Sequence, residues 1–126
     1  MNWKVEFDEK YQIVILAYNG SNSAKDIFES SFSAIELTNK KKVYKMLVES
    51  ENIITKLKRA DIFKLPFELY NKWGLNRSIR IALIKPRDIE AQQIASFYEI
   101  STRNLGWDTK IFPERKTALT WLSEEY

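Results

Sequence analysis

The stretch Ile13-Val14-Ile15-Leu16 decides the fold class, because it is continuously apolar and rich in β-branched side chains. β-Branched residues favour strands, and a strand without polar side chains is covered by other elements on both of its faces. Sheets covered on both faces are typical of α/β proteins, in which helices connect parallel strands. We therefore predict a strand over residues 11–18, buried between two layers.

The residues before this stretch predict a second, more exposed strand. Trp3, Val5 and Phe7 alternate with polar neighbours, as a strand with one wet face requires. Only Asp8-Glu9-Lys10 separates this run from the next one. A connection this short predicts an antiparallel hairpin, with strands at 4–7 and 11–18.

Downstream, the apolar pattern alternates between helical and extended spacing. Ser23 followed by Asp26 resembles a capping box and predicts a helix that ends near Thr38. Further strands are expected at 43–49, 79–84 and 109–112, and further helices at 61–73, 86–106 and around 118–122. We expect residues 19–22 to end the second strand and residues 50–60 to form a loop. Asp61 is expected to cap the second helix, and Pro66 either to mark its first turn or to kink it.

The resulting order is β-β-α-β-α-β-α-β-α, which predicts an α/β fold. Its sheet would be single, mixed and mostly parallel, with five strands, an N-terminal antiparallel hairpin and four helices. No repeat or linker interrupts the chain, so residues 1–126 are expected to form a single domain. The residues that we expect to be almost fully buried are Ile15, Phe28, Val48, Ile81, Leu83, Ile94 and Leu122.

The amino-acid composition excludes several kinds of catalytic and ligand-binding site. The chain contains no His and no Cys, so Ser-His-Asp triads, Cys-His dyads and the usual zinc sites cannot form. Gly20, Gly74 and Gly106 lie far apart, which excludes a glycine-rich phosphate loop. Carboxylates could act as acid and base, but no spacing brings two of them together in a cleft. We expect no catalytic residue, no metal site and no cofactor, and hence no enzyme.

The sequence also bears on location. The longest apolar run, Ile13 to Tyr18, is far shorter than the roughly 20 residues of a membrane span. Residues 1–6 alternate and carry charge, unlike a signal peptide. We therefore expect a cytoplasmic protein without a membrane span.

Charge is distributed unevenly along the chain. Residues 40–87 hold 13 Lys and Arg against 4 Asp and Glu, although the net charge of the whole chain is only +3. Loops that leave the carboxyl ends of parallel strands gather at one edge of the sheet, where ligands of α/β proteins bind. The candidates there for binding an anion or an acidic partner are Lys56, Lys58, Arg59, Lys85, Arg87 and Ser21. The alternative is that these side chains are simply solvated, and no nucleic-acid motif accompanies them.

The second predicted helix is apolar on nearly every side. Such a helix is deeply buried or offers a surface to a partner. Phe63, Phe67, Tyr70 and Trp73 are therefore candidates for an association face, which a homodimer could bury. The wall of an apolar pocket and a set of half-exposed aromatic side chains are the alternatives.

Several strings give the chain a resemblance to a known family. They are Gly20 to Asp26 at the first helix, Arg80-Ile81-Ala82-Leu83-Ile84, and Lys110-Ile111-Phe112 leading to Ala118-Leu119-Thr120-Trp121-Leu122. Together with the element order they resemble the STAS-like domains of bacterial anti-sigma-factor antagonists, in particular the STAS/SEC14-like branch. The resemblance implies binding modules that dock protein partners, in some members under Ser/Thr phosphorylation, or that hold apolar ligands.

One position departs from the phosphorylated members of that family. They carry an Asp-Ser-Ser/Thr-Gly type of turn after the third strand, whereas this chain reads Val48-Glu49-Ser50-Glu51-Asn52. Ser50 is the positional candidate for phosphorylation, but its acidic neighbours would repel a phosphate. The function that we expect is a non-catalytic regulatory or protein-interaction module. The alternative is a carrier or sensor of a small apolar or amphipathic anionic ligand.

Overall fold

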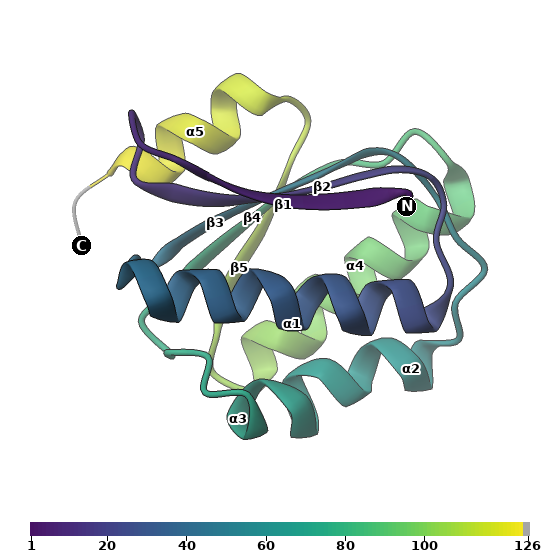
Figure 1. Cartoon of the computed structure of the whole chain (residues 1–126). Coiled ribbons are helices and arrows are strands. Elements are labelled where there is room, and N and C mark those ends of the chain that lie inside the picture. The colour runs from purple at the N-terminus through teal and green to yellow at the C-terminus, as the bar shows by residue number, and fades with distance from the viewer. Residues whose placement is uncertain (125–126) are drawn as a thin grey trace.

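The computed structural model describes residues 1–124. Within them, five strands form one sheet in the order β1-β2-β3-β4-β5. β1 is antiparallel to β2, and the other neighbouring pairs are parallel, so the predicted hairpin and mixed sheet are confirmed (Figure 1). The strands are β1 (Trp3–Asp8), β2 (Ile13–Ser21), β3 (Lys45–Ile54), β4 (Arg80–Ile84) and β5 (Asp108–Phe112).

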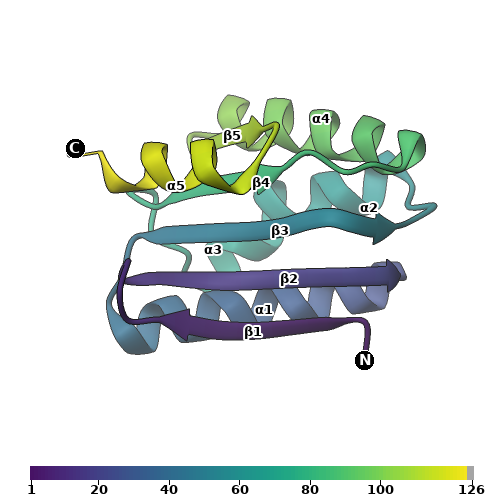
Figure 2. The same ribbon diagram turned by 90° about the horizontal axis from the view of Figure 1, so that it is seen from above.

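Helices cover both faces of this sheet. They are α1 (Ala24–Lys41), α2 (Arg59–Lys64), the π-helical turn η1 (Leu65–Leu69), α3 (Tyr70–Lys72), α4 (Ile89–Asn104) and α5 (Arg115–Ser123). α2, η1 and α3 follow one another without a break, which gives the four helical segments that the sequence predicts. Figures 1 and 2 show α5 on one face and all the other helices on the opposite face, with α1 under β1 and β2.

The apolar stretch in β2 contributes side chains to the hydrophobic cores on both faces of the sheet. Ile13 and Ile15 belong to the smaller core under α5, whereas Val14 and Leu16 belong to the larger core under the other helices. Because successive side chains of a strand point to opposite faces, a strand between two helical layers needs apolar residues at every position. The prediction that this strand is covered on both faces is confirmed.

The expected core is largely present. Five of the seven residues that we expected in the core are buried, namely Ile15, Val48, Ile81, Leu83 and Leu122. Phe28 and Ile94 are only half-buried and pack at the margin of the larger core. The ammonium group of Lys64 lies 6.0 Å from the ring centre of Phe28, so this ring also meets the surface.

α1 starts as its sequence predicts. The Ser23 hydroxyl accepts a hydrogen bond from the Asp26 amide, and the Asp26 carboxylate accepts one from the Ser23 amide. The helix continues to Lys41, past the predicted end at Thr38, and Lys42 then takes a left-handed conformation with φ 55°. Lys40 and Lys41 thus lie in the last turn, where cations suit the negative end of the helix dipole.

Two strands extend well past their predicted ends, and both begin two residues later than predicted, at Ile13 and Lys45. β2 continues through Asn19 and Gly20 to Ser21, and β3 continues through residues 50–54, which we expected to be loop. These extensions pair with each other beyond the end of β4, with Gly20 opposite Ile53. Asn19, Asn52 and Ile54 are exposed there, which is why a polar sequence can still be a strand.

The second helix also differs from the prediction. It begins at Arg59 with Lys58 as its N-cap, so Asp61 lies inside the first turn and does not cap it. Pro66 lies in η1, where the Tyr70 amide donates to the Leu65 carbonyl, five residues back. Because proline has no amide proton and its ring crowds the preceding turn, the helix widens here into a π-helical turn and continues directly into α3.

Candidate functional site

A cavity of about 80 Å³ lies in the larger core, between the sheet and helices α1, α2 and α4. Its wall is made of apolar side chains together with a few hydroxyl groups, and no described residue that lines it is charged. Such a space can hold a small uncharged or mostly apolar molecule. The hydroxyl-bearing residues in the wall are Tyr18, Ser31, Ser50, Thr55, Tyr70 and Tyr98.

The size of the cavity limits what it holds in this state. One water molecule needs roughly 10–15 Å³, and an engineered apolar cavity of about 150 Å³ binds benzene. A volume of about 80 Å³ lies between these two cases. A ligand larger than a small fragment therefore requires the helical layer to move outward.

Tyr18 is hydrogen-bonded within the protein. Its hydroxyl lies 2.6 Å from Ser30 Oγ, and Ser30 Oγ lies 3.0 Å from the Ile27 carbonyl oxygen. A carbonyl oxygen only accepts, so the Ser30 proton goes to Ile27 and Tyr18 donates to Ser30. Burial raises the pKa of Tyr18 to about 12, which keeps this phenol neutral at pH 7.

Tyr70 and Tyr98 form a second polar group in the cavity wall. Their hydroxyl oxygens are 2.5 Å apart, and the two residues come from α3 and α4. Burial raises the pKa of both phenols well above the ordinary value. Tyr70 and Trp107 also pack edge to face, with ring centres 5.4 Å apart, which fixes the position of the phenol.

Ser50 lies inside β3 and is buried, although the sequence placed it in a loop. Its hydroxyl donates to the Ile84 carbonyl at 2.6 Å and so ties β3 to the end of β4. Phosphorylation of Ser50 stays a prediction, and it would require this hydroxyl to leave its buried bond. Thr55 has a similar role, donating to the Asn22 carbonyl at 3.0 Å.

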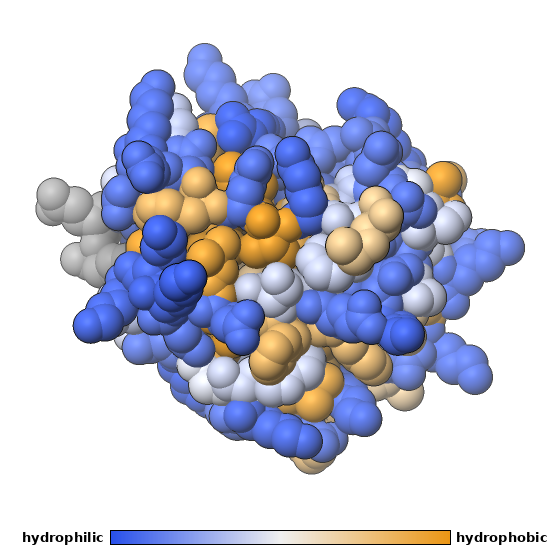
Figure 3. Space-filling view, viewed as in Figure 1, coloured by the Kyte–Doolittle hydropathy of each residue, from blue (hydrophilic) through white to orange (hydrophobic). Residues whose placement is uncertain are grey.

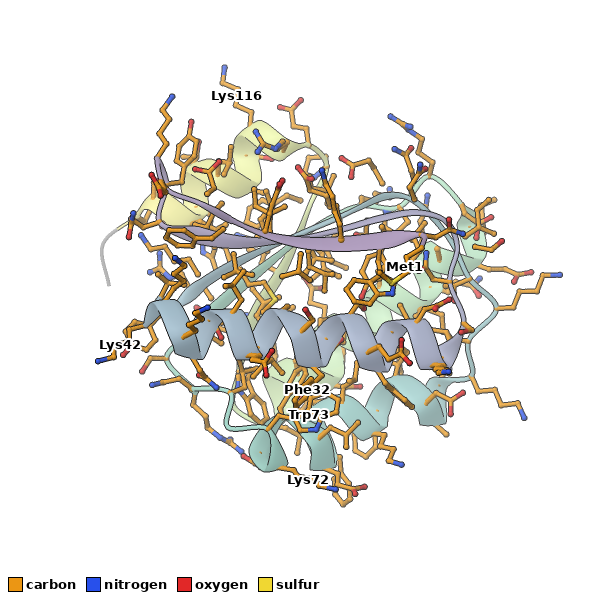
Figure 4. The ribbon with its side chains drawn as sticks, in the orientation of Figure 1. Met1, Phe32, Lys42, Lys72, Trp73 and Lys116 are labelled. Carbon is orange, nitrogen blue, oxygen red and sulfur yellow. The ribbon has the colours of Figure 1, made fainter. Side chains whose placement is uncertain are left out.

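Aromatic side chains lie on the outside of the helical layer. We call Phe32, Phe63, Phe67 and Trp73 the aromatic surface. Phe32 and Trp73 meet edge to face with ring centres 5.4 Å apart (Figure 4), and Phe63 stacks on Phe67 at 5.2 Å. Phe67 is 63% exposed, Phe32 45% and Phe63 37%. In Figure 3, apolar patches interrupted by charged side chains cover this side of the molecule.

The candidate association residues therefore separate into two groups. Phe63 and Phe67 are exposed and Trp73 is half-buried, but Tyr70 points inward and is only 4% exposed. The widened turn η1 explains the difference, because it buries Leu69 and Tyr70 next to each other and leaves Phe67 outside. Tyr70 thus belongs to the cavity and not to the surface.

The predicted anion site maps to the edge of the sheet where β2, β3 and β4 end (Figure 2). Arg59 lies over the Phe97 ring at 5.6 Å, whereas Arg87 donates to the Asn52 side chain, so the two arginines have different partners. The carboxylates of Asp26 and Asp88 already cap α1 and α4 at this edge. The predicted residues exposed there are Ser21, Lys56, Lys58, Arg59, Lys85 and Arg87.

Several carboxylates are engaged in structural contacts. Glu49 pairs with Arg115 at 2.9 Å, and Glu99 accepts a hydrogen bond from the Ile111 amide at 2.7 Å. Within residues 1–124, no cluster of three or more His, Cys, Asp or Glu could hold a metal ion. In the same residues, no helix combines the length and the apolar character needed to span a membrane.

Sequence reasoning offered an apolar pocket as one alternative for the second helix, but it missed two of the tyrosines that line the cavity. Tyr18 follows the apolar run of β2 and Tyr98 lies on the buried side of α4, so neither stands out from an ordinary core position. The signal that could have revealed them is their chemistry, because a buried phenol needs a hydrogen-bond partner. Three tyrosines at core positions predict a polar group inside the core.

The sheet order, the parallel crossovers and the single antiparallel hairpin define a STAS-like α/β fold, as the sequence suggested. A solved structure shares it: an uncharacterized protein of the DUF3478 family with a SpoIIAA-like fold, from Shewanella loihica PV-4. The superposition covers 95% of this chain and 91% of that one, with a TM-score of 0.56 and 16% sequence identity. This likeness shows the fold alone. No protein-family model matches the sequence, and no curated protein does either.

Proposed function

We propose that the protein is a non-catalytic binding module that holds a small, mostly apolar molecule between its sheet and its helical layer. The cavity carries this proposal, because it combines an apolar wall with a few hydroxyl groups. Sites for small molecules commonly have this composition, in which apolar side chains provide most of the contact and a few polar groups orient the ligand.

The chemistry of the wall supports a role in binding over one in catalysis. General acid–base catalysis needs a group whose pKa lies near the working pH. The groups in this wall that titrate are tyrosines, and burial raises the pKa of Tyr18, Tyr70 and Tyr98. Their neutral hydroxyls can orient a ligand at pH 7 but do not act as bases there.

Native mass spectrometry of gently purified protein tests this function. We expect a population with added mass that organic extraction removes. Ala95→Leu, which adds volume at a buried position of the cavity wall, should abolish the added mass. Ala60→Leu, the same change at an exposed position of α2, should retain it. A wild-type protein that carries no ligand and binds none from a panel of small apolar compounds would contradict the proposal.

A second function rests on the aromatic surface. Phe63 and Phe67 stack on the outside of α2 and η1, and both are exposed, Phe67 more than Phe63. An exposed apolar patch of this kind favours a protein partner or a second copy of the chain. Sedimentation should then show association that Phe63→Glu with Phe67→Glu removes without unfolding. A wild-type chain that stays monomeric at high micromolar concentration would contradict the homodimer form.

A further inference from the structure

The hydroxyl pair of Tyr70 and Tyr98 contains one proton more than the described hydrogen bonds use. Each phenol has one proton to donate, and a single hydrogen bond joins the two oxygens. Whichever phenol accepts that bond must direct its own proton elsewhere. Among residues 1–124, neither hydroxyl has another side-chain or backbone acceptor. The pair therefore presents one free donor.

This donor is buried and lies in the cavity wall. Tyr70 is 4% exposed and Tyr98 is 9% exposed, and both line the cavity. A buried donor without a partner is unfavourable, so a molecule that offers an acceptor at this point stabilises the folded protein. Tyr18 differs, because its proton is already donated to Ser30.

The wall also limits the charge of the ligand. No described residue of the cavity wall carries a charge, and Lys56, Lys58 and Arg87 are exposed outside it. A carboxylate at the tyrosine pair would lose its hydration without gaining a cation, which is strongly unfavourable. A neutral oxygen acceptor has no such cost.

We propose that the Tyr70–Tyr98 pair is the polar anchor of the cavity, and that the ligand is a neutral molecule with an apolar body and one carbonyl or similar oxygen acceptor. This inference rests on the proposed ligand-binding function and adds the chemical class of the ligand. It also places the acceptor next to the free phenol proton, away from the sheet edge that carries the basic residues.

Two probes with the same number of non-hydrogen atoms test the anchor, and both require the helical layer to move outward from the cavity of about 80 Å³. Cyclohexanone and methylcyclohexane differ in that one presents a carbonyl oxygen where the other presents a methyl group. Their affinities can be measured from chemical shifts of the methyl groups in the cavity wall. The ketone loses more hydration than the hydrocarbon when it binds, so the informative quantity is the ratio of the two affinities compared with the ratio in a variant that lacks both phenols. One neutral hydrogen bond should raise the ketone-to-hydrocarbon affinity ratio of the wild type by roughly twofold to tenfold over that variant. Cyclohexanecarboxylate at pH 7 should bind more weakly than the ketone.

Tyrosine-to-phenylalanine variants sharpen the test. Tyr70→Phe and Tyr98→Phe each leave one phenol proton, so each single variant should keep the higher affinity ratio of the wild type. The double variant has no donor at the pair and should lose this roughly twofold to tenfold gain of the ketone over the hydrocarbon. Tyr18→Phe is the matched control and should keep the affinity ratio of the wild type, because the proton that it removes is already donated to Ser30. The methyl spectra report whether each variant is folded.

The outcomes separate this inference from the function on which it rests. The same ketone-to-hydrocarbon affinity ratio in the wild type and in the double variant would mean that the pair holds water only, which overturns the anchor and leaves the binding function standing. If cyclohexanecarboxylate binds more tightly than the ketone, the proposal that the ligand is neutral is wrong. If neither probe binds, the proposed function and the anchor both fail.

Discussion

Tyr70→Phe and Tyr98→Phe should change the free energy of unfolding in a strongly non-additive way, so that the double variant loses far less than the sum of the two single losses. Tyr70→Phe or Tyr98→Phe alone breaks the bond between the two oxygens and leaves one buried hydroxyl without any partner. Each single change should cost about 1–3 kcal/mol, the penalty for stranding a buried polar group. The double change removes both partners and the free donor together, and replacing both partners by apolar groups of the same shape can be nearly neutral. We therefore expect the double variant to be at least as stable as either single variant.

Equilibrium unfolding in urea at pH 7 measures this cycle, provided that the slope of the transition stays the same among the four proteins. We expect a coupling free energy of at least about 1–3 kcal/mol, the value that holds if the double variant is only as stable as a single variant. Tyr70→Phe combined with Tyr11→Phe is the control, because Tyr11 packs on the smaller core across the sheet. That pair should be additive within about 0.5 kcal/mol. Additive losses for Tyr70 and Tyr98 would refute the hydrogen bond and the proton count built on it.

Three further predictions concern the core, alkaline pH and the basic edge. Leu83→Ala should cost about 2–5 kcal/mol, since Leu83 is buried in β4 and already borders a cavity, and a loss below about 1 kcal/mol would contradict its packing. Burial raises the pKa of Tyr18 from 10.0 to about 12, so its contribution to stability is complete below pH 10 and is lost as the pH rises toward 12. That loss is about 1.4 kcal/mol per pH unit, and unfolding free energies that stay constant over this range would count against it. Reversing Lys58, Arg59 and Arg87 to Glu together should weaken phosphate binding and make it less sensitive to salt, whereas unchanged binding would remove the anion site.

The parts of the fold that could be predicted from the sequence are those set by short-range sequence patterns. Ile13 to Leu16 revealed a strand covered on two sides, because no polar residue could point to water. Ser23 and Asp26 located the start of α1 to the residue, since the capping box is a short-range pattern. Such features depend on neighbours in the chain and need no knowledge of the tertiary structure.

The missed features depend on contacts between distant residues. β3 continues to Ile54 because β2 extends beside it, and the polar run Glu49 to Asn52 gives no local sign of this. The widened turn at Pro66 decides that Tyr70 faces the cavity and Phe67 faces water, which an ideal helical period does not reveal. The tyrosine pair joins residues 28 positions apart, so it exists only once α3 and α4 pack together.

The central claim, that the larger core receives an apolar molecule, is tested most directly by locating a bound probe. Cyclohexanone can be titrated into protein whose Ile and Leu methyl groups are labelled, with spectra recorded at each step. We predict saturable shifts at Leu16, Ile27, Ile81 and Leu83, which line the cavity, and none at Ile13, Ile15 and Leu47, which face α5. Shifts confined to the α5 side or to surface methyl groups, or no saturable shift at all, would contradict the account.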